Sequence, residues 1–321
     1  MIVPFSLKPG SSILISGCGG GFDFLCGTPL GFELEAAGHR VCYSSYTFSN
    51  LSWVREPRKL GPYITVVEAD DVMKGADEYA RYFPEKVFCE WYRSTFSRRT
   101  RVYCYQGLAV CHLRDAFDLV YDQEQVDYHF VVDGGCDGIF RGDEFDLGTP
   151  STDAISIIAA SRSKTRAGKW YVLTAFGTEG IGKGVSHAEA LRRISERIAD
   201  GSGLAVSSIT NNREASRLFL SAFEYITASM PLRFQSTIAS SIAASLAGRY
   251  GDQEVNAKTE MYKVWVSPLT SLVWYLDVKA VAESKLYYQE VLEAPSSIGV
   301  NVAIERLIHS RARGRREGIP I

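Results

Sequence analysis

The chain has 321 residues, of which 46% are hydrophobic and 22% charged, and this is the composition of an ordinary globular protein. A formal net charge of −2 argues against nucleic acid as the main partner, because nucleic-acid-binding surfaces are usually basic. The chain shows no signal peptide and no apolar run of membrane-spanning length. Its seven cysteines lack C-x-x-C spacing and are typical of reduced thiols. We therefore expect a cytoplasmic protein with no membrane partner, and we leave open whether it forms a homo-oligomer.

The first predicted unit lies between residues 12 and 46 and consists of a strand, a glycine-rich loop, a helix and a second strand. The loop contains Gly19, Gly20 and Gly21 and is followed by Asp23. Backbone N–H groups before a helix bind phosphate or carboxylate when no side chain blocks the approach, so these three glycines are predicted to bind ligand. The spacing differs from G-x-G-x-x-G and does not predict a dinucleotide. The alternative is a tight turn in which the glycines serve packing alone.

Strands and helices continue to alternate as far as residue 203. Strands are predicted at residues 63–68, 102–105, 128–132 and 171–176, and helices at 76–84, 87–96, 107–121, from about 152, and 187–198. This alternation predicts a Rossmann-like α/β core over residues 1–203, with a doubly wound, mostly parallel sheet. Residues 204–321 are predicted to be a mainly helical region packed on that core, with helices at 211–229, 235–246, from 267, and 300–311, and a strand at 261–266.

An acidic loop follows the strand at 128–132. Its carboxylates are Asp133, Asp137, Asp143, Glu144, Asp146 and Asp153. Carboxylates at the C-terminal edge of a parallel sheet lie where such sheets bind ligands, and three uses remain open: holding a hard cation such as Mg²⁺, bonding ribose hydroxyls, or acid–base catalysis. The alternative is a solvated loop with turn aspartates.

Specific roles follow for the residues of this loop. We predict Asp133 to carry the chemistry, with Asp137 and Asp23 in support. Ligand binding is assigned to Gly134, Gly135 and Thr149, the last at the start of a helix. Asp143 and Glu144 are predicted metal ligands, with Mg²⁺ the implied cofactor.

Three weaker signals complete the list of candidates. The stretch GTEGIGKG at residues 177–184 fits a phosphate-binding loop, but glycine stands where Ser or Thr should contact Mg²⁺. His129 is expected to be a core residue. Cys18 and Cys136 lie inside the two loops, where small size explains them as well as nucleophilic reactivity does.

Three motifs together resemble the prokaryotic family known as domain of unknown function 1152. They are GCGGGFD at residues 17–23, DGGCDGIFRGDEFDLGTPSTD at 133–153 and SPLTSLVWYLD at 267–277. Their order and spacing agree with the family over nearly the whole chain. The family name implies no activity, so the resemblance supports the positions of the two loops and leaves the reaction open.

The function predicted from the two loops is that of an enzyme, a hydrolase or group transferase, acting on a phosphorylated or nucleotide-like small molecule held between them. Two alternatives remain: a non-catalytic small-molecule-binding or regulatory protein, and an enzyme for an amine or amino-acid substrate.

Overall fold

The computed structural model describes residues 2–75, 81–164, 167–178, 185–260 and 262–310. None of the helices in these ranges combines the length and the apolar character needed to cross a membrane. The strands of the main sheet are β1 (Ser12–Gly20), β2 (Arg40–Tyr46), β3 (Arg58–Lys59), β4 (Thr65–Glu68), β5 (Arg101–Tyr105), β6 (Tyr128–Gly134), β7 (Gly168–Thr174), β8 (Gly203–Ser208) and β11 (Leu272–Asp277). A separate ladder pairs β9 (Gly251–Gln253) with β10 (Val264–Val266).

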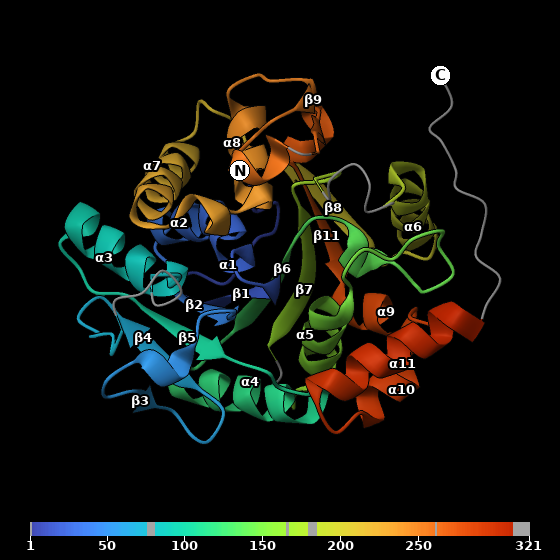
Figure 1. Cartoon of the computed structure of the whole chain (residues 1–321), viewed down its shortest axis with the longest axis horizontal. Coiled ribbons are helices and arrows are strands. Elements are labelled where there is room, and N and C mark those ends of the chain that lie inside the picture. Colours follow the sequence, from blue (N-terminus) through green and yellow to red (C-terminus); the bar gives the residue numbers. More distant parts are fainter. Residues whose placement is uncertain (1, 76–80, 165–166, 179–184, 261, 311–321) are drawn as a thin grey trace.

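The main sheet has the strand order β3-β4-β5-β2-β1-β6-β7-β11-β8 (Figure 1). The five strands from β5 to β7 in this order are parallel, whereas the pairs outside them are antiparallel. From β1 the chain builds β2 and then β5 on one side, and it returns across β1 to build β6 on the other. The order in which strands are added therefore reverses between β1 and β6. A ligand-binding crevice is expected at the carboxyl ends of these two strands.

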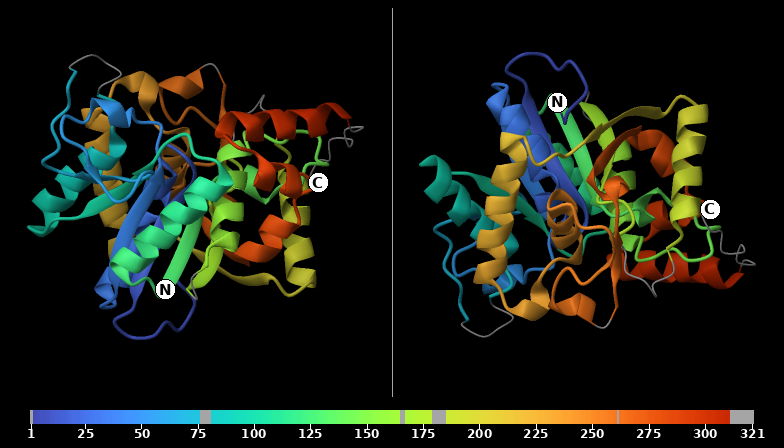
Figure 2. Two further views of the ribbon diagram at one scale, coloured as in Figure 1. Left: turned by 90° about the horizontal axis from the view of Figure 1, so that it is seen from below. Right: turned by 90° about the horizontal axis from the view of Figure 1, so that it is seen from above.

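Helices cover both faces of the sheet. One face carries α1 (Asp23–Cys26), α2 (Thr28–Ala36), α3 (Pro84–Phe96), α7 (Glu214–Ser229) and α8 (Thr237–Leu246). The other carries α4 (Val110–Glu124), α5 (Ser151–Arg162), α6 (His187–Ala199), α9 (Val278–Glu283), α10 (Tyr288–Glu293) and α11 (Ser297–Ser310). The view from below in Figure 2 has α4 in front of the sheet, and the view from above has α7 and α8 in front. This arrangement confirms the doubly wound, mostly parallel fold.

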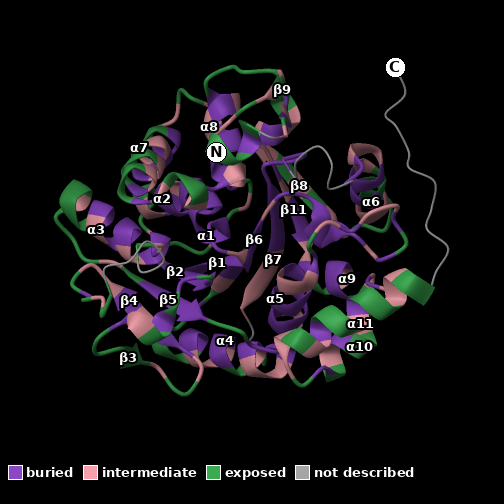
Figure 3. Cartoon of the chain, in the orientation of Figure 1, coloured by how far each residue is buried: buried purple, intermediate pink, exposed green. Residues whose placement is uncertain are grey.

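Alternation along the central strands explains why the sheet has two cores. In β1, Leu14 packs on one face, while Ile13 and Ile15 pack on the other. In β6, Val131 and Phe130 divide in the same way. Because helices cover both faces, these strands are buried throughout and read as continuous apolar runs. Figure 3 shows the buried strands at the centre of the molecule and the exposed outer sides of the helices.

The region after residue 203 contributes more to the sheet than its sequence predicts. Beside helices α7 to α11, it supplies β8 and β11, and β11 pairs with β7. The segment beginning at Ser267 was predicted to be a helix, but it forms only a single 3₁₀ turn, Pro268–Ser271, before β11. Strand β8 escapes prediction because it is short and partly exposed at the sheet edge. Part of the helix predicted at 76–84 lies outside the described residues, and α3 begins at Pro84.

The sheet arrangement predicts that a fragment ending at residue 203 does not fold on its own. Without β11, the apolar strand β7 becomes an unprotected edge, and the helices α7 and α8 no longer cover β1 and β6. The fragment should be insoluble or should lack a cooperative unfolding transition, measured by circular dichroism in urea beside the full chain. A soluble fragment with a cooperative transition would show instead that residues 1–203 form an independent domain.

Candidate functional site

The carboxyl ends of β1 and β6 open into one cavity of about 490 Å³. Its walls come from the loops after β1, β2, β6 and β7, from the first turns of α5 and α8, and from the segment between β9 and β10. The lining residues are Gly19, Gly20, Asp23, Phe48, Asp133, Gly134, Asp137, Gly148, Thr149, Thr152, Asp153, Thr178, Thr237, Ile238, Lys258 and Tyr262. The glycine-rich loop and the acidic loop therefore meet, although more than 100 residues separate them in the sequence.

Asp23 lies at the start of α1 and is held by the glycine-rich loop. Its Oδ2 accepts a hydrogen bond of 2.8 Å from the backbone N–H of Gly19. A Cβ at position 19 would lie 2.6 Å from this oxygen and 2.8 Å from Oδ1 of Asp153. A Cβ there would have to displace one of these two carboxylates, so the glycine at 19 permits their close approach.

Asp133 is the penultimate residue of β6 and is almost fully buried. Its Oδ2 accepts a hydrogen bond from the hydroxyl of Tyr171 on the neighbouring strand β7, and the backbone of Gly138 also bonds it. A Cβ at Gly138 would overlap the Asp133 carboxylate. The strand pairing and the tight turn after β6 therefore fix the orientation of this side chain.

Asp137 and Asp153 come from the acidic loop and from the first turn of α5. Asp137 accepts hydrogen bonds through Oδ2 from the backbone N–H of Thr149 (2.7 Å) and from its hydroxyl (3.4 Å). Asp153 is 4% exposed, and no hydrogen-bond donor in the described ranges reaches its carboxylate. One carboxylate oxygen from each of Asp23, Asp133 and Asp153 lies within 4.8 Å of the others.

Burial raises the pKa of every carboxyl group in this cluster, and repulsion by neighbouring carboxylates adds to the effect at Asp23, Asp133 and Asp153. Burial, followed by the charge of Asp137, raises the pKa of Asp133 to about 7. Burial, followed by the charge of Asp133, raises the pKa of Asp23 and of Asp153 well above the usual range. Burial also raises the pKa of Asp137. A carboxyl group that titrates near neutral pH can accept or donate a proton under physiological conditions.

Lys285, between α9 and α10, is a buried cation whose charge acts on the carboxyl groups of the cluster. Burial lowers its pKa, and the cluster's negative charges oppose this effect. Its Nζ donates to the backbone oxygens of Gly138 (2.6 Å) and Phe140 (3.1 Å), so it braces the turn after β6. Its charge lowers the pKa values of Asp133, Asp137 and Asp153 but does not bring them back to the usual range.

Most of the backbone N–H groups predicted to bind ligand have acceptors inside the protein. The N–H of Gly19 bonds Asp23, and that of Gly21 bonds the carbonyl oxygen of Tyr46 (3.2 Å). Gly21 and Gly135 do not line the cavity, and Gly135 donates to the carbonyl oxygen of Thr174. The loop after β1 therefore orients a carboxylate, and the structure gives no support to it as a phosphate cradle.

Asp143 and Glu144 do not reach the cavity, contrary to their prediction as metal ligands beside Asp133. Both bind Arg193 of α6, at 2.8 Å from Asp143 and 2.5 Å from Glu144. Glu144 also accepts the backbone N–H groups of Arg141 and Gly142, and these bonds with Arg193 hold its pKa below the usual range despite burial. These two carboxylates therefore tie the acidic loop to α6.

The remaining candidate residues either have a structural explanation or lie outside the residues that the structure describes. His129 is buried, with Oγ of Ser16 at 2.7 Å and the hydroxyl of Tyr121 at 2.6 Å from its ring nitrogens, and burial lowers its pKa to about 3. Burial raises the pKa of the Cys18 thiol, which disfavours a nucleophilic thiolate. Most of the glycine-rich stretch at 177–184 lies outside the described residues.

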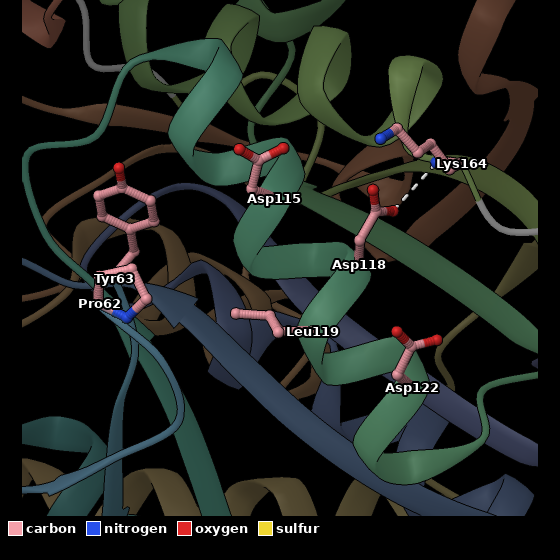
Figure 4. Close-up of a pocket in the computed structure, with 7 residues that line it drawn as sticks. All are labelled: Pro62, Tyr63, Asp115, Asp118, Leu119, Asp122 and Lys164. Atoms are coloured by element: carbon pink, nitrogen blue, oxygen red, sulfur yellow. Dashed lines mark hydrogen bonds between the residues drawn. The ribbon is translucent and has the colours of Figure 1, made fainter.

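A second hollow, of about 530 Å³, lies on the outer side of α4 (Figure 4). Asp115, Asp118 and Asp122 line it from one helix face, opposite Pro62 and Tyr63. Two of these aspartates are solvent-exposed, and Asp118 accepts the backbone N–H of Lys164 at 3.0 Å. Solvated carboxylates of this kind need no ligand, so the cavity at β1 and β6 is the stronger candidate site.

Several lining residues were not among those predicted from the sequence. Thr237, Lys258 and Tyr262 come from segments with no local motif, and only the folded chain brings them to the cavity, whereas Thr178 lies at the start of the GTEGIGKG stretch. Asp153 had a signal, because it ends the T-P-S-T-D helix start within the acidic motif. Its position in the first turn of α5 directs it toward the carboxyl ends of β1 and β6.

The fold and the site together define a Rossmann-like α/β protein with a buried acidic pocket at the point where the strand order of the sheet reverses. A family model described as "Protein of unknown function (DUF1152)" matches residues 90–310. The chain belongs to this family, as its motifs indicated, although the GCGGGFD motif lies outside the matched stretch. No curated protein and no solved structure matches the chain.

The raised pKa values predict that the free protein loses stability as the pH rises. An unfolded aspartate titrates near pH 4, whereas Asp133 titrates at about 7, so the folded chain binds more protons between these values. Stability should therefore fall between about pH 4 and pH 7 for this group. Thermal unfolding in a chelating buffer across this range measures the effect.

Replacing Asp153 by Asn should remove part of this repulsion. We expect Asp153→Asn to raise the stability of the chelator-treated protein at pH 8 by about 1–2 kcal/mol, with little change at pH 4. The matched control is Asp143→Asn, which loses a pairing with Arg193 and should not stabilise the protein. A lower melting temperature for Asp153→Asn than for the parent at pH 8 would contradict this electrostatic description.

Proposed function

We propose that the protein is an enzyme, a hydrolase or group transferase, that acts on a phosphorylated or nucleotide-like small molecule in the cavity at β1 and β6. The observation that carries this proposal is the meeting of four buried carboxyl groups with raised pKa values in the crevice where open α/β sheets bind ligands. A volume of about 490 Å³ suits a small molecule.

Proton transfer is the role of the Asp133–Asp137 pair. Asp133, with a pKa of about 7, accepts the proton of a water molecule or a substrate hydroxyl as the oxygen attacks the transferred group. A neighbouring carboxyl that is still protonated gives its proton to the leaving oxygen. The number of protons bound by the cluster is therefore the same before and after the reaction. Like charges that push apart the pKa values of adjacent carboxyls support this division between acid and base.

Substrate recognition involves the polar and aromatic walls of the cavity. The hydroxyls of Thr152 and Thr237 offer donors and acceptors for sugar hydroxyls, and that of Thr178, which donates to the carbonyl oxygen of Ala175, offers an acceptor. Phe48, which is 60% exposed and lies against Gly20, offers an aromatic face on which a base can stack. Lys258 supplies a positive charge for a phosphate.

One observation favours a second candidate, an enzyme for an amine or amino-acid substrate. Four aspartates line the cavity, whereas Lys258 is the single basic lining residue in the described ranges. A pocket with this charge attracts an ammonium group directly, and it accepts a phosphate only with additional positive charge.

A ligand panel with a turnover assay separates the candidates. Nucleotides and sugar phosphates should raise the melting temperature and be converted to product, whereas stabilisation by amines alone favours the second candidate. Asp133→Asn should lower kcat at least about 100-fold, because a positioned base contributes this much or more. Asp122→Asn, on the solvent side of α4, is the matched control and should leave kcat unchanged.

Tight ligand binding that Asp133→Asn leaves intact, together with no product from any member of the panel, would contradict catalysis. It would support the non-catalytic binding protein instead.

A further inference from the structure

We infer that Asp23, Asp133 and Asp153 bind one hard divalent cation, Mg²⁺ or Mn²⁺, inside the cavity. The inference deepens the proposed function and rests on the same site. It replaces Asp143 and Glu144, which the sequence suggested, with three carboxylates from the start of α1, the end of β6 and the first turn of α5. Oxygen ligands of this kind select Mg²⁺ and Mn²⁺ over softer transition metals.

The spacing of the three carboxylates suits one ion. One oxygen from each residue lies within 4.8 Å of the other two. Opposite ligands of an octahedral Mg²⁺ are about 4.2 Å apart, twice the usual ligand distance, and larger separations close by small side-chain rotations. Gly19 leaves the space between Asp23 and Asp153 free of any side chain, because a Cβ there would lie 2.6 and 2.8 Å from their oxygens.

Asp153 provides an independent observation that points to a ligand. The residue is 4% exposed and lines the cavity, and its carboxylate has no hydrogen-bond donor among the residues that the structure describes. Buried carboxylates are normally satisfied by hydrogen bonds or ion pairs. A cation bound in the cavity would supply the partner that the protein does not.

Buried carboxylates elsewhere in the chain show the contrast. Glu85 accepts hydrogen bonds from the hydroxyls of Ser45 (2.8 Å) and Ser49 (2.9 Å), and Glu144 pairs with Arg193. At these two positions outside the cavity, the fold supplies partners for the buried carboxylate. Asp153 differs because its neighbours in the cavity are other carboxylates.

Lys285 does not serve as the missing counter-charge. Its Nζ bonds two backbone oxygens in the turn after β6, and it forms no ion pair with a carboxylate in the described part of the chain. A divalent cation bound by the three aspartates would offset two of their negative charges. It would also present open positions to a phosphate oxygen. With Asp133 bound to the cation, accepting the proton would pass to Asp137, the other member of the pair assigned to proton transfer.

Titration of the purified, chelator-treated protein tests the site without any activity assay. MnCl₂ and MgCl₂ are added at constant ionic strength, with KCl as the reference, while the melting temperature and the electron paramagnetic resonance signal of free Mn²⁺ are followed. We expect one saturable site per chain, a raised melting temperature, and displacement of Mn²⁺ by Mg²⁺. Asp153→Asn should weaken the affinity at least tenfold.

Asp143→Asn is the matched control, because it removes a carboxylate from the same acidic loop without touching the triad, and it should bind Mn²⁺ like the parent. Gly19→Ala, which places a methyl group between Asp23 and Asp153, should weaken binding and serves if Asp153→Asn fails to fold. No saturable binding by the parent, or equal loss in Asp143→Asn and Asp153→Asn, overturns the site.

Failure of the cation site and failure of the proposed function give different results. Turnover that persists in excess chelator overturns the cation site but agrees with the proposed enzymatic function. Saturable Mn²⁺ binding that depends on Asp153, without turnover of any phosphorylated compound, supports the site and contradicts the enzyme.

Discussion

Repulsion among four buried carboxyl groups is the constraint on which the account of this protein depends. Asp23, Asp133, Asp137 and Asp153 lie in one cavity, where burial raises the pKa of each and the charge of neighbouring carboxylates raises it further for all but Asp137. A fold selected for stability alone would place apolar side chains there, because desolvated like charges destabilise the folded state. The surrounding protein tolerates the cluster and orients it, which is typical of a functional site.

The order of the strands explains how these residues come together. Because β1 and β6 are neighbours in the sheet while the chain between them builds its opposite half, residues 23 and 133 meet across the crevice. Helix α5 then returns from the acidic loop and places Asp153 beside them. The region after residue 203 completes the pocket from α8 and the segment near Lys258, so the site depends on the whole chain.

Local sequence patterns predicted the parallel core and part of the candidate site, but not the antiparallel strands β8 and β11. The run at β1, the glycine loop and the apolar strand ending at Asp133 predicted the parallel core and the meeting of its two loops. The patterns could not predict that Glu144 would pair with Arg193, because residues 49 positions apart meet only after folding. The N–H of Gly19 was predicted to bind an anion, whereas in the structure it donates to Asp23, only four residues further along the chain. Charge and spacing show which side chains are reactive, whereas their partners depend on tertiary packing.

The most direct test of the central claim is the anomalous diffraction of crystals grown with MnCl₂. The account predicts one strong anomalous peak in the cavity at β1 and β6, within about 2.2 Å of oxygens from Asp23, Asp133 and Asp153. A peak confined to exposed carboxylates such as those on α4, with the cavity free of any ion and open to solvent, would contradict it.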